Sequence, residues 1–275
     1  MTPLTGWSSG FLSADGIKLH YLRRGQGQPA LLLHGVSDNG ACWGRAAHAL
    51  AEAYDVILLD QRAHGLSDAP ASGYTLAAMT QDVVTVIESL ELSNLLLIGH
   101  SMGSSVALKL AGICPDLVDK LVMIDTPLSS AVRDPNLSDK ARAELRRSYF
   151  VWLRDMKAQT AEALLAAHSL HLRGWSPEEK RHWAEAKEQT RPVIWGERGI
   201  DFSEDWRAQF ESLKSPALFV RGDPATGGRV SDAEAAELTL YIGAENVVML
   251  PATGHSPHRE DFEGFIEVLQ TFLGA

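Results

Sequence analysis

The sequence predicts an α/β protein whose mostly parallel central sheet carries helices on both faces. Short, continuous apolar runs recur along the chain, as expected of strands that are buried on both faces. Amphipathic helical patterns separate most of these runs, and strands that alternate with helices form parallel sheets. The runs cover residues 30–35, 55–60, 94–99, 120–125, 217–222 and 246–251.

The N-terminal segment predicts a β-hairpin ahead of the first of these strands. Asp15-Gly16 is a turn dipeptide, and after it the apolar Ile17, Leu19 and Tyr21 alternate with polar residues. Farther along, apolar residues recur at helical spacing. One such set is Leu76, Met79, Val83, Val86, Ile87 and Leu90, and another is Phe262, Phe265, Ile266, Leu269 and Phe272.

One long segment interrupts the alternation. No strand pattern lies between residues 126 and 215, where helical patterns cover residues 139–158, 160–172 and 177–187. We therefore expect an α/β core at residues 1–126 and 216–275 and a helical cap at residues 127–215. Five of the seven tryptophans fall in the cap: Trp152, Trp175, Trp183, Trp195 and Trp206. Tryptophan needs apolar surroundings, which favours a lid over the strand ends; the alternative is a solvated annex without a role in binding.

Composition limits the possible partners. The formal net charge is −10, and there is no basic run, so we expect neither nucleic acid nor an anionic membrane surface as a partner. The chain shows no signal-peptide pattern and no apolar run of about 20 residues, which predicts a cytoplasmic protein without a membrane span. The two cysteines, Cys42 and Cys114, are expected to be free thiols.

The segment Gly99-His100-Ser101-Met102-Gly103 joins an apolar strand to a helix. Glycines at its two ends permit a sharp turn, which exposes the serine at the carboxyl edge of the sheet, where parallel sheets bind ligands. This context is that of a nucleophile elbow, and Ser101 is the predicted nucleophile. The alternative is a serine that only caps the helix.

A serine hydroxyl needs a base, and His255 is the predicted one. It lies between the last strand and the final helix, at the same sheet edge as Ser101. Its nearest rival, His258, falls at the start of the final helix. The side chain of His100 must point away from its neighbour Ser101, and the other histidines fall on strand or helix faces.

An oxyanion also needs preorganised N–H donors. The amide of Met102, at the N-terminus of the helix that follows Ser101, is the first predicted donor. The loop after residues 30–35 turns close to the serine at His34-Gly35, and the amide of Val36 is the second.

With these motifs in this order, the chain resembles the α/β-hydrolase superfamily. Within it, the chain resembles the capped, single-domain type to which serine esterases and lactonases belong. The resemblance extends over nearly the whole chain. It rests on His34-Gly35, LLDQRAHGLSD at residues 58–68, GHSMG at residues 99–103, the helical cap and Gly254-His255. The family usually has glycine where this chain has Ala63. The resemblance implies an α/β-hydrolase fold and the chain order nucleophile, acid, histidine.

The acid of the triad is not at the position usual in the family. Family members commonly carry an aspartate three residues beyond a glycine after the strand that follows the cap, but here that residue is Ala225. Asp125 is the preferred candidate, because some branches, such as the haloalkane dehalogenases, place the acid after the equivalent strand. Asp223 is the alternative. Asp125 could instead cap the turn into the cap segment, and Asp223 could belong to a surface turn before proline.

These residues predict a serine hydrolase of the carboxylic ester hydrolase class, which cleaves a small apolar ester or lactone through an acyl-enzyme. We expect no cofactor and no metal, because the sequence has neither a ligand cluster nor a phosphate-binding glycine loop. An epoxide hydrolase or dehalogenase would need an aspartate where Ser101 stands. Three alternatives keep the same triad or fold: a carbon–carbon bond hydrolase, a cofactor-free haloperoxidase and a weakly catalytic ligand receptor.

Overall fold

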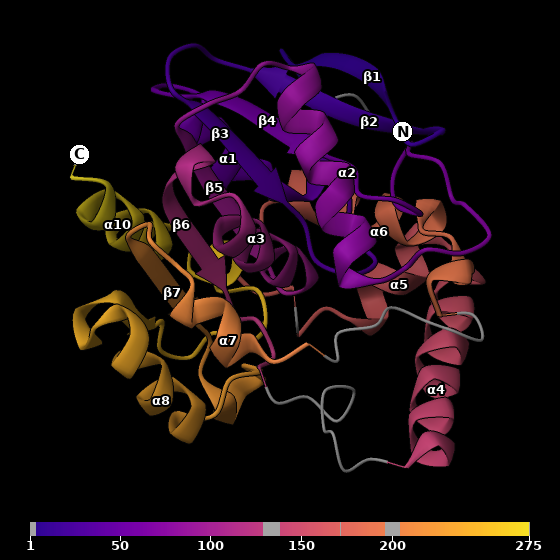
Figure 1. Cartoon of the computed structure of the whole chain (residues 1–275). Helices are drawn as coiled ribbons and strands as arrows, with labels where there is room; N and C mark the ends of the chain where they lie inside the picture. Colours follow the sequence, from indigo (N-terminus) through magenta and orange to yellow (C-terminus); the bar gives the residue numbers. More distant parts are fainter. Residues whose placement is uncertain (1–3, 129–137, 171, 196–203, 275) are drawn as a thin grey trace.

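The strands form one sheet in the order β1-β2-β4-β3-β5-β6-β7-β8 (Figure 1). In this computed structural model, which describes residues 4–128, 138–170, 172–195 and 204–274, β1 and β2 pair antiparallel with their neighbours and all other pairs are parallel. The strands are β1 (Ser8–Ala14), β2 (Ile17–Arg24), β3 (Pro29–Leu33), β4 (Asp55–Leu59), β5 (Leu95–His100), β6 (Val118–Ile124), β7 (Ala217–Arg221) and β8 (Val247–Met249). The mostly parallel sheet is confirmed.

The predicted hairpin joins β1 to β2. Its two turn residues have positive φ angles, 46° at Asp15 and 82° at Gly16, which is the type I′ geometry that follows the twist of an antiparallel pair. Ala14 pairs with Ile17 across the turn, so the loop has two residues, as the dipeptide predicts.

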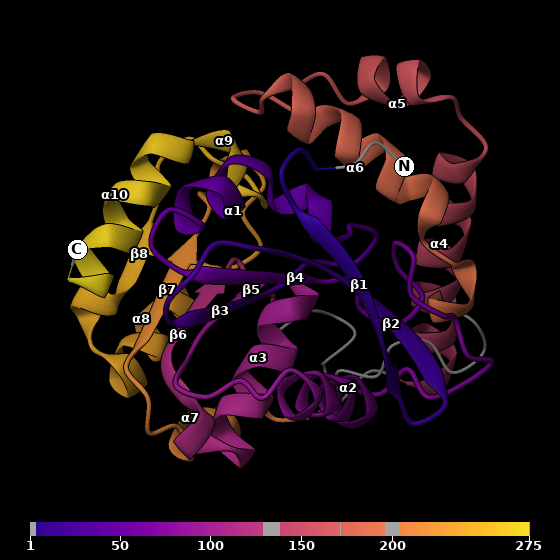
Figure 2. The same cartoon turned by 90° about the horizontal axis from the view of Figure 1, so that it is seen from above.

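Helices cover both faces of the sheet (Figure 2). Helices α2 (Leu76–Ser89), α3 (Met102–Ile113) and α8 (Asp232–Ile242) pack in one apolar cluster, and α1 (Gly44–Leu50) and α10 (Phe262–Leu273) pack in the other. All six residues of β5 are buried, which explains why this strand reads as a continuous apolar run. Within the described residues, no helix combines the length and the apolar content that crossing a membrane requires.

A helical segment lies between β6 and β7, as predicted. Its helices are α4 (Asp139–Lys157), α5 (Ala161–Ala167), α6 (Pro177–Gln189) and α7 (Trp206–Glu211), with a 3-10 turn η3 (Pro192–Trp195). Each of α4, α5 and α6 begins at a hydroxyl N-cap, and α6 adds a capping box between Ser176 and Glu179. These three helices gather on one side of the molecule, away from α8 and α10 (Figure 1).

The tryptophans of this segment have different surroundings. Trp206 is buried in the core cluster, where it packs edge-on against Phe210, so α7 lies with the core although it falls within residues 127–215. Trp152 is 40% exposed. Trp175 and Trp183 pack edge-on against each other. Two features lie outside the described residues: the side chain of Trp195, and residue 171 within the predicted 160–172 helix.

Candidate active site

Ser101 occupies a strained turn between β5 and α3. Its φ angle is 52°, in the left-handed region that costs a residue with a side chain about 1 kcal/mol or more. Both neighbouring glycines are required by close backbone approach. A Cβ on Gly99 would lie 2.5 Å from the Ser104 backbone, and a Cβ on Gly103 would lie 2.0 Å from the Leu33 carbonyl oxygen. The glycines therefore let α3 start directly against β3 and β5.

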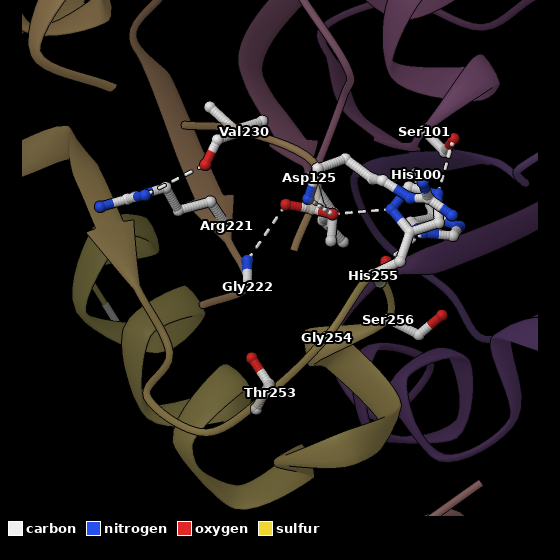
Figure 3. Close-up of polar contacts among 12 residues, drawn as sticks. His100, Ser101, Asp125, Arg221, Gly222, Val230, Thr253, Gly254, His255 and Ser256 are labelled. Carbon is white, nitrogen blue, oxygen red and sulfur yellow. Dashed lines mark hydrogen bonds and ion pairs between the residues drawn. The ribbon is translucent and has the colours of Figure 1, made fainter. Parts of the chain in front are cut away.

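A chain of hydrogen bonds runs from Ser101 through His255 to Asp125 (Figure 3). Ser101 Oγ lies 3.0 Å from His255 Nε2, and His255 Nδ1 lies 2.7 Å from Asp125 Oδ2. Ser101 is 6% exposed, the His255 side chain is 31% exposed, and the Asp125 side chain is fully buried. The structure thus brings together three of the residues that the sequence singles out, from three loops at the carboxyl edge of the sheet.

Asp125 is fixed by backbone donors that the sequence did not suggest. The Gly222 N–H donates to its Oδ1 over 3.1 Å, and the Arg229 N–H donates to its Oδ2 over 2.9 Å. Burial raises the pKa of Asp125, but the hydrogen bond from His255 and these two N–H groups outweigh it, so the pKa lies below its ordinary value. The carboxylate is therefore ionised at neutral pH.

Asp223, the alternative acid, has another partner. Its Oδ1 accepts a hydrogen bond of 2.8 Å from the Ala225 N–H, which caps the short turn η4 (Pro224–Thr226). Among the described residues, no hydrogen bond or ion pair joins Asp223 to His255. The loop that holds Asp223 still contributes to the site, because the Gly222 N–H orients Asp125.

The two predicted oxyanion donors flank the nucleophile. Met102 begins α3, and Val36 follows Gly35 in the loop after β3. Gly35 lies so close to the elbow that a Cβ on it would be 3.3 Å from Ser101 Cβ. Within the described part of the chain, no hydrogen bond joins the Val36 or the Met102 amide to a protein acceptor.

His100 and His258 lie behind the site rather than in it. His100 Nε2 is 2.8 Å from the His255 carbonyl oxygen. Burial, with the neighbouring His255, lowers the pKa of His100 to about 3, so the ring is neutral and its proton must lie on Nε2 to donate to a carbonyl. His258 lies in the short helix α9 (Pro257–Glu260), which precedes the final helix, and not at the start of the final helix as expected. It is fully buried and packs on the rings of His100 and Trp43.

A second Ser–His–Asp set lies toward the end of the sheet that β1 and β2 form. Ser9 Oγ is 2.8 Å from His20 Nε2, and His20 Nδ1 is 2.7 Å from Asp60 Oδ2. Ser9, however, lies within edge strand β1 and not at a helix N-terminus. Asp60 also accepts backbone hydrogen bonds from Gly40 and Leu66, so this set ties strands to loops. Distances alone therefore do not distinguish a nucleophile; the elbow does.

Cysteine and metal chemistry have little support in the described residues. Cys42 and Cys114 are free, as expected, and burial raises the pKa of the Cys42 thiol to about 12. Among the described residues, no three His, Cys, Asp or Glu side chains are grouped so that they could hold a metal ion.

Comparison with known proteins places the chain in a family. A family model described as the alpha/beta hydrolase fold matches residues 29–262. Among curated proteins, the chain is 27% identical to 2-(acetamidomethylene)succinate hydrolase of Mesorhizobium japonicum, covering 94% of this chain and 92% of that protein. It is also 27% identical to N-formylmaleamate deformylase of Pseudomonas putida, with 97% and 96% covered.

Solved structures agree on the fold. The crystal structure of E-2-(acetamidomethylene)succinate hydrolase superposes with a TM-score of 0.78 at 23% identity, covering 98% of this chain and all of that one. An esterase from Exiguobacterium antarcticum gives a TM-score of 0.75 at 24% identity, with 96% and 99% covered. At these identities the likeness concerns the fold alone.

Proposed function

The chain belongs to the α/β-hydrolase fold family, and from this premise we propose that it is a serine hydrolase that cleaves a carboxylic ester or lactone through an acyl-enzyme. The observation that carries the proposal is the hydrogen-bond chain from Ser101 through His255 to the buried Asp125. The amides of Met102 and Val36, which have no protein acceptor among the described residues, support it, because ester cleavage needs donors for a developing oxyanion.

In the proposed acylation step, Ser101 Oγ attacks the ester carbonyl while His255 Nε2 takes the serine proton. The electron pair of the carbonyl moves to its oxygen, which the N–H groups of Met102 and Val36 stabilise. His255 then gives the proton to the leaving alkoxide as the tetrahedral intermediate collapses. Asp125 accepts from His255 Nδ1, which keeps Nε2 free to accept the serine proton.

In the proposed deacylation step, His255 takes a proton from water, whose oxygen attacks the acyl carbon. The second tetrahedral intermediate uses the same two N–H donors, and collapse returns the proton to Ser101. Neither step needs a cofactor. We further propose that residues 127–215 form a cap over a small apolar substrate and that residues 1–126 and 216–275 form the catalytic core.

A second candidate substrate class comes from the relatives. The names of two proteins at 27% identity describe a deformylase and the hydrolysis of an acetamido compound, so their substrates carry an acylated nitrogen. The same acyl-transfer chemistry, with an amine or enamine nitrogen as leaving group, would cleave such an N-acyl compound.

The deciding experiment combines turnover with labelling. Purified protein is assayed on p-nitrophenyl esters, lactones, and N-formyl and N-acetyl enamides, and is incubated with a fluorophosphonate probe. We expect turnover of at least one class and covalent label on Ser101 alone. A Ser101→Ala variant is the matched control and should lose both. If wild-type protein takes no label and turns over no substrate, the serine hydrolase proposal is wrong.

A further inference from the structure

A buried carboxylate in the loop that carries Val36 holds two cations. Asp38 is 4% exposed, and its two oxygens lie 2.8 Å from Lys187 Nζ and 2.6 Å from Arg259 Nη2. Lys187 and Arg259 are only 1% and 2% exposed. Burial raises the pKa of Asp38, but the two cations lower it further, to well below its ordinary value, so this is a true ion cluster.

The cluster joins three segments that are distant in sequence. Asp38 belongs to the loop after β3, Lys187 to helix α6 of the segment between β6 and β7, and Arg259 to α9 (Pro257–Glu260), just beyond His255. Two tryptophans of the segment between β6 and β7 make cation–π contacts with these side chains. Lys187 Nζ lies 4.8 Å from the ring centre of Trp183, and the Arg259 guanidinium lies 4.6 Å from the ring centre of Trp175.

Lys187 also bonds the backbone next to Val36. Its Nζ donates to the Ser37 carbonyl oxygen over 2.8 Å. Ser37 has a φ angle of 63°, so the turn places a residue with a side chain in the left-handed region and needs external support. The other peptide group of Ser37 is held as well, because its N–H donates to His64 Nε2 over 3.2 Å.

The last turn of α6 makes a second contact with this loop. Asn39 Nδ2 donates to Gln189 Oε1 over 2.7 Å. Helix α6 therefore bonds to the three residues that directly follow Val36. Lys187 bonds to Ser37 and Asp38, and Gln189 bonds to Asn39.

We propose that Lys187 is a positioning residue for the oxyanion hole. By holding Ser37 and Asp38 it fixes the turn that presents the Val36 N–H, and it makes the geometry of that donor depend on the docking of α6 onto the core. The inference rests on the proposed function, since an oxyanion hole matters only if Ser101 performs acyl transfer. An oxyanion donor must lie within a few tenths of an ångström of its working place, so a loosened turn costs rate rather than ground-state binding.

The test replaces Lys187 by methionine, which keeps a long apolar stem and removes the charge and the donor. Asp38 keeps Arg259, so Lys187→Met leaves no unpaired carboxylate. The matched control is Lys157→Met, because Lys157 Nζ donates to the carbonyl oxygens of Lys187 and Glu188 at the same helix end, and no hydrogen bond of the described residues joins it to the Val36 loop. If Lys187→Met does not fold, Lys187→Gln, which is neutral and keeps an N–H donor, takes its place.

The readout separates positioning from mere structural support. A trifluoromethyl ketone substrate analogue is attacked by Ser101 Oγ, its carbonyl oxygen becomes an oxyanion in the hole, and the serine proton passes to His255. The corresponding alcohol fills the same pocket but cannot form the oxyanion. Both inhibition constants are measured with kcat and KM for wild type and variants.

We expect Lys187→Met to lower kcat/KM by about 10- to 100-fold, below the roughly 10²- to 10³-fold loss for deleting a whole donor, because the amide itself remains. Ketone affinity should fall by the same factor, and alcohol affinity should stay within about twofold of wild type. Lys157→Met should leave all of these values within about twofold.

Two results overturn the inference: a folded Lys187→Met with near-wild-type kcat/KM, or an equal loss of ketone and alcohol affinity. Wild-type protein that neither hydrolyses esters nor binds the ketone would instead contradict the proposed function itself. The two failures are therefore distinguishable.

Discussion

His255 Nδ1 lies 2.7 Å from Asp125 Oδ2, across 130 residues of sequence, whereas Asp223 bonds its own loop at Ala225. This relationship separates the two candidate acids by geometry. Asp125 is also the more strongly held carboxylate, because two backbone N–H groups and one ring nitrogen surround it. Each role assigned to these residues leads to a measurable expectation.

Asp125→Asn should lower kcat on p-nitrophenyl acetate by about 10⁴-fold, because an amide in that place favours the wrong tautomer of His255. Asp223→Asn is the matched control, since it removes a carboxylate from the neighbouring loop and keeps an acceptor for the Ala225 N–H. Its kcat should stay within about twofold of wild type. Similar losses in both variants would contradict the assignment of Asp125 as the acid.

Ser9 should remain unreactive despite its His20 and Asp60 partners. It lies in a strand and lacks the helix N-terminus and the strained backbone turn that give Ser101 an oxyanion donor. In a Ser101→Ala variant, the fluorophosphonate probe should therefore label no residue, as read by mass spectrometry of tryptic peptides. Ser9→Ala should label as wild type does. Label on Ser9 would mean that hydrogen-bond distances alone create a nucleophile here.

The sequence predicts the sheet well because strands buried on both faces leave no polar alternation. Residues 94–99 were expected as a strand, and β5 covers Leu95–His100. The elbow is equally local, since Gly99, Ser101 and Gly103 carry the turn within five residues. The choice between Asp125 and Asp223, in contrast, cannot be made from local sequence. It depends on how Gly222 packs against the Gly254 loop, which is a contact between distant segments.

Lys187 could not be read from the sequence either. On a helix as polar as α6, a lysine resembles a solvated surface charge, and its partner Asp38 lies 149 residues away. The five tryptophans of residues 127–215 require apolar surroundings, and this requirement favoured a lid over the strand ends. Two of them, Trp175 and Trp183, in fact pack against the buried cations Arg259 and Lys187.

Stability should fall steeply as the solution is acidified below about pH 6.5. Burial lowers the pKa values of His100 and His64 to about 3, so both remain neutral when folded but bind protons when unfolded. The unfolded state therefore binds more protons than the folded state between about pH 6.5 and pH 3. Across that window, each histidine lowers the free energy of unfolding by about 1.4 kcal/mol for every unit by which the pH falls. For the pair, the free energy of unfolding should drop by about 3 kcal/mol per unit.

Urea titrations at pH 5.0, 5.5 and 6.0 measure this slope. His100→Gln keeps a donor for the His255 carbonyl but does not titrate, so its slope should be smaller than that of wild type by about 1.4 kcal/mol per pH unit. His48→Gln is the control, because His48 is half-buried on α1, away from the site. A flat wild-type profile over this range would contradict the assignment of neutral buried rings.

Gly103→Ala should disable the elbow while Gly112→Ala, on the same helix α3, should not. A Cβ at residue 103 would meet the Leu33 carbonyl oxygen at 2.0 Å, and neither backbone can yield without moving α3 from β3. We expect a loss of about 2–3 kcal/mol in unfolding free energy, as for other overpacked sites, together with a large drop in kcat.

At residue 112, the nearest atom is Ser212 Oγ at 2.7 Å, a side-chain hydroxyl that can rotate away, and alanine gains helix propensity. Chemical denaturation and ester turnover measure both variants. If Gly103→Ala kept wild-type kcat, Ser101 would not depend on the close approach of α3 to the sheet, and the elbow would not be what presents the nucleophile.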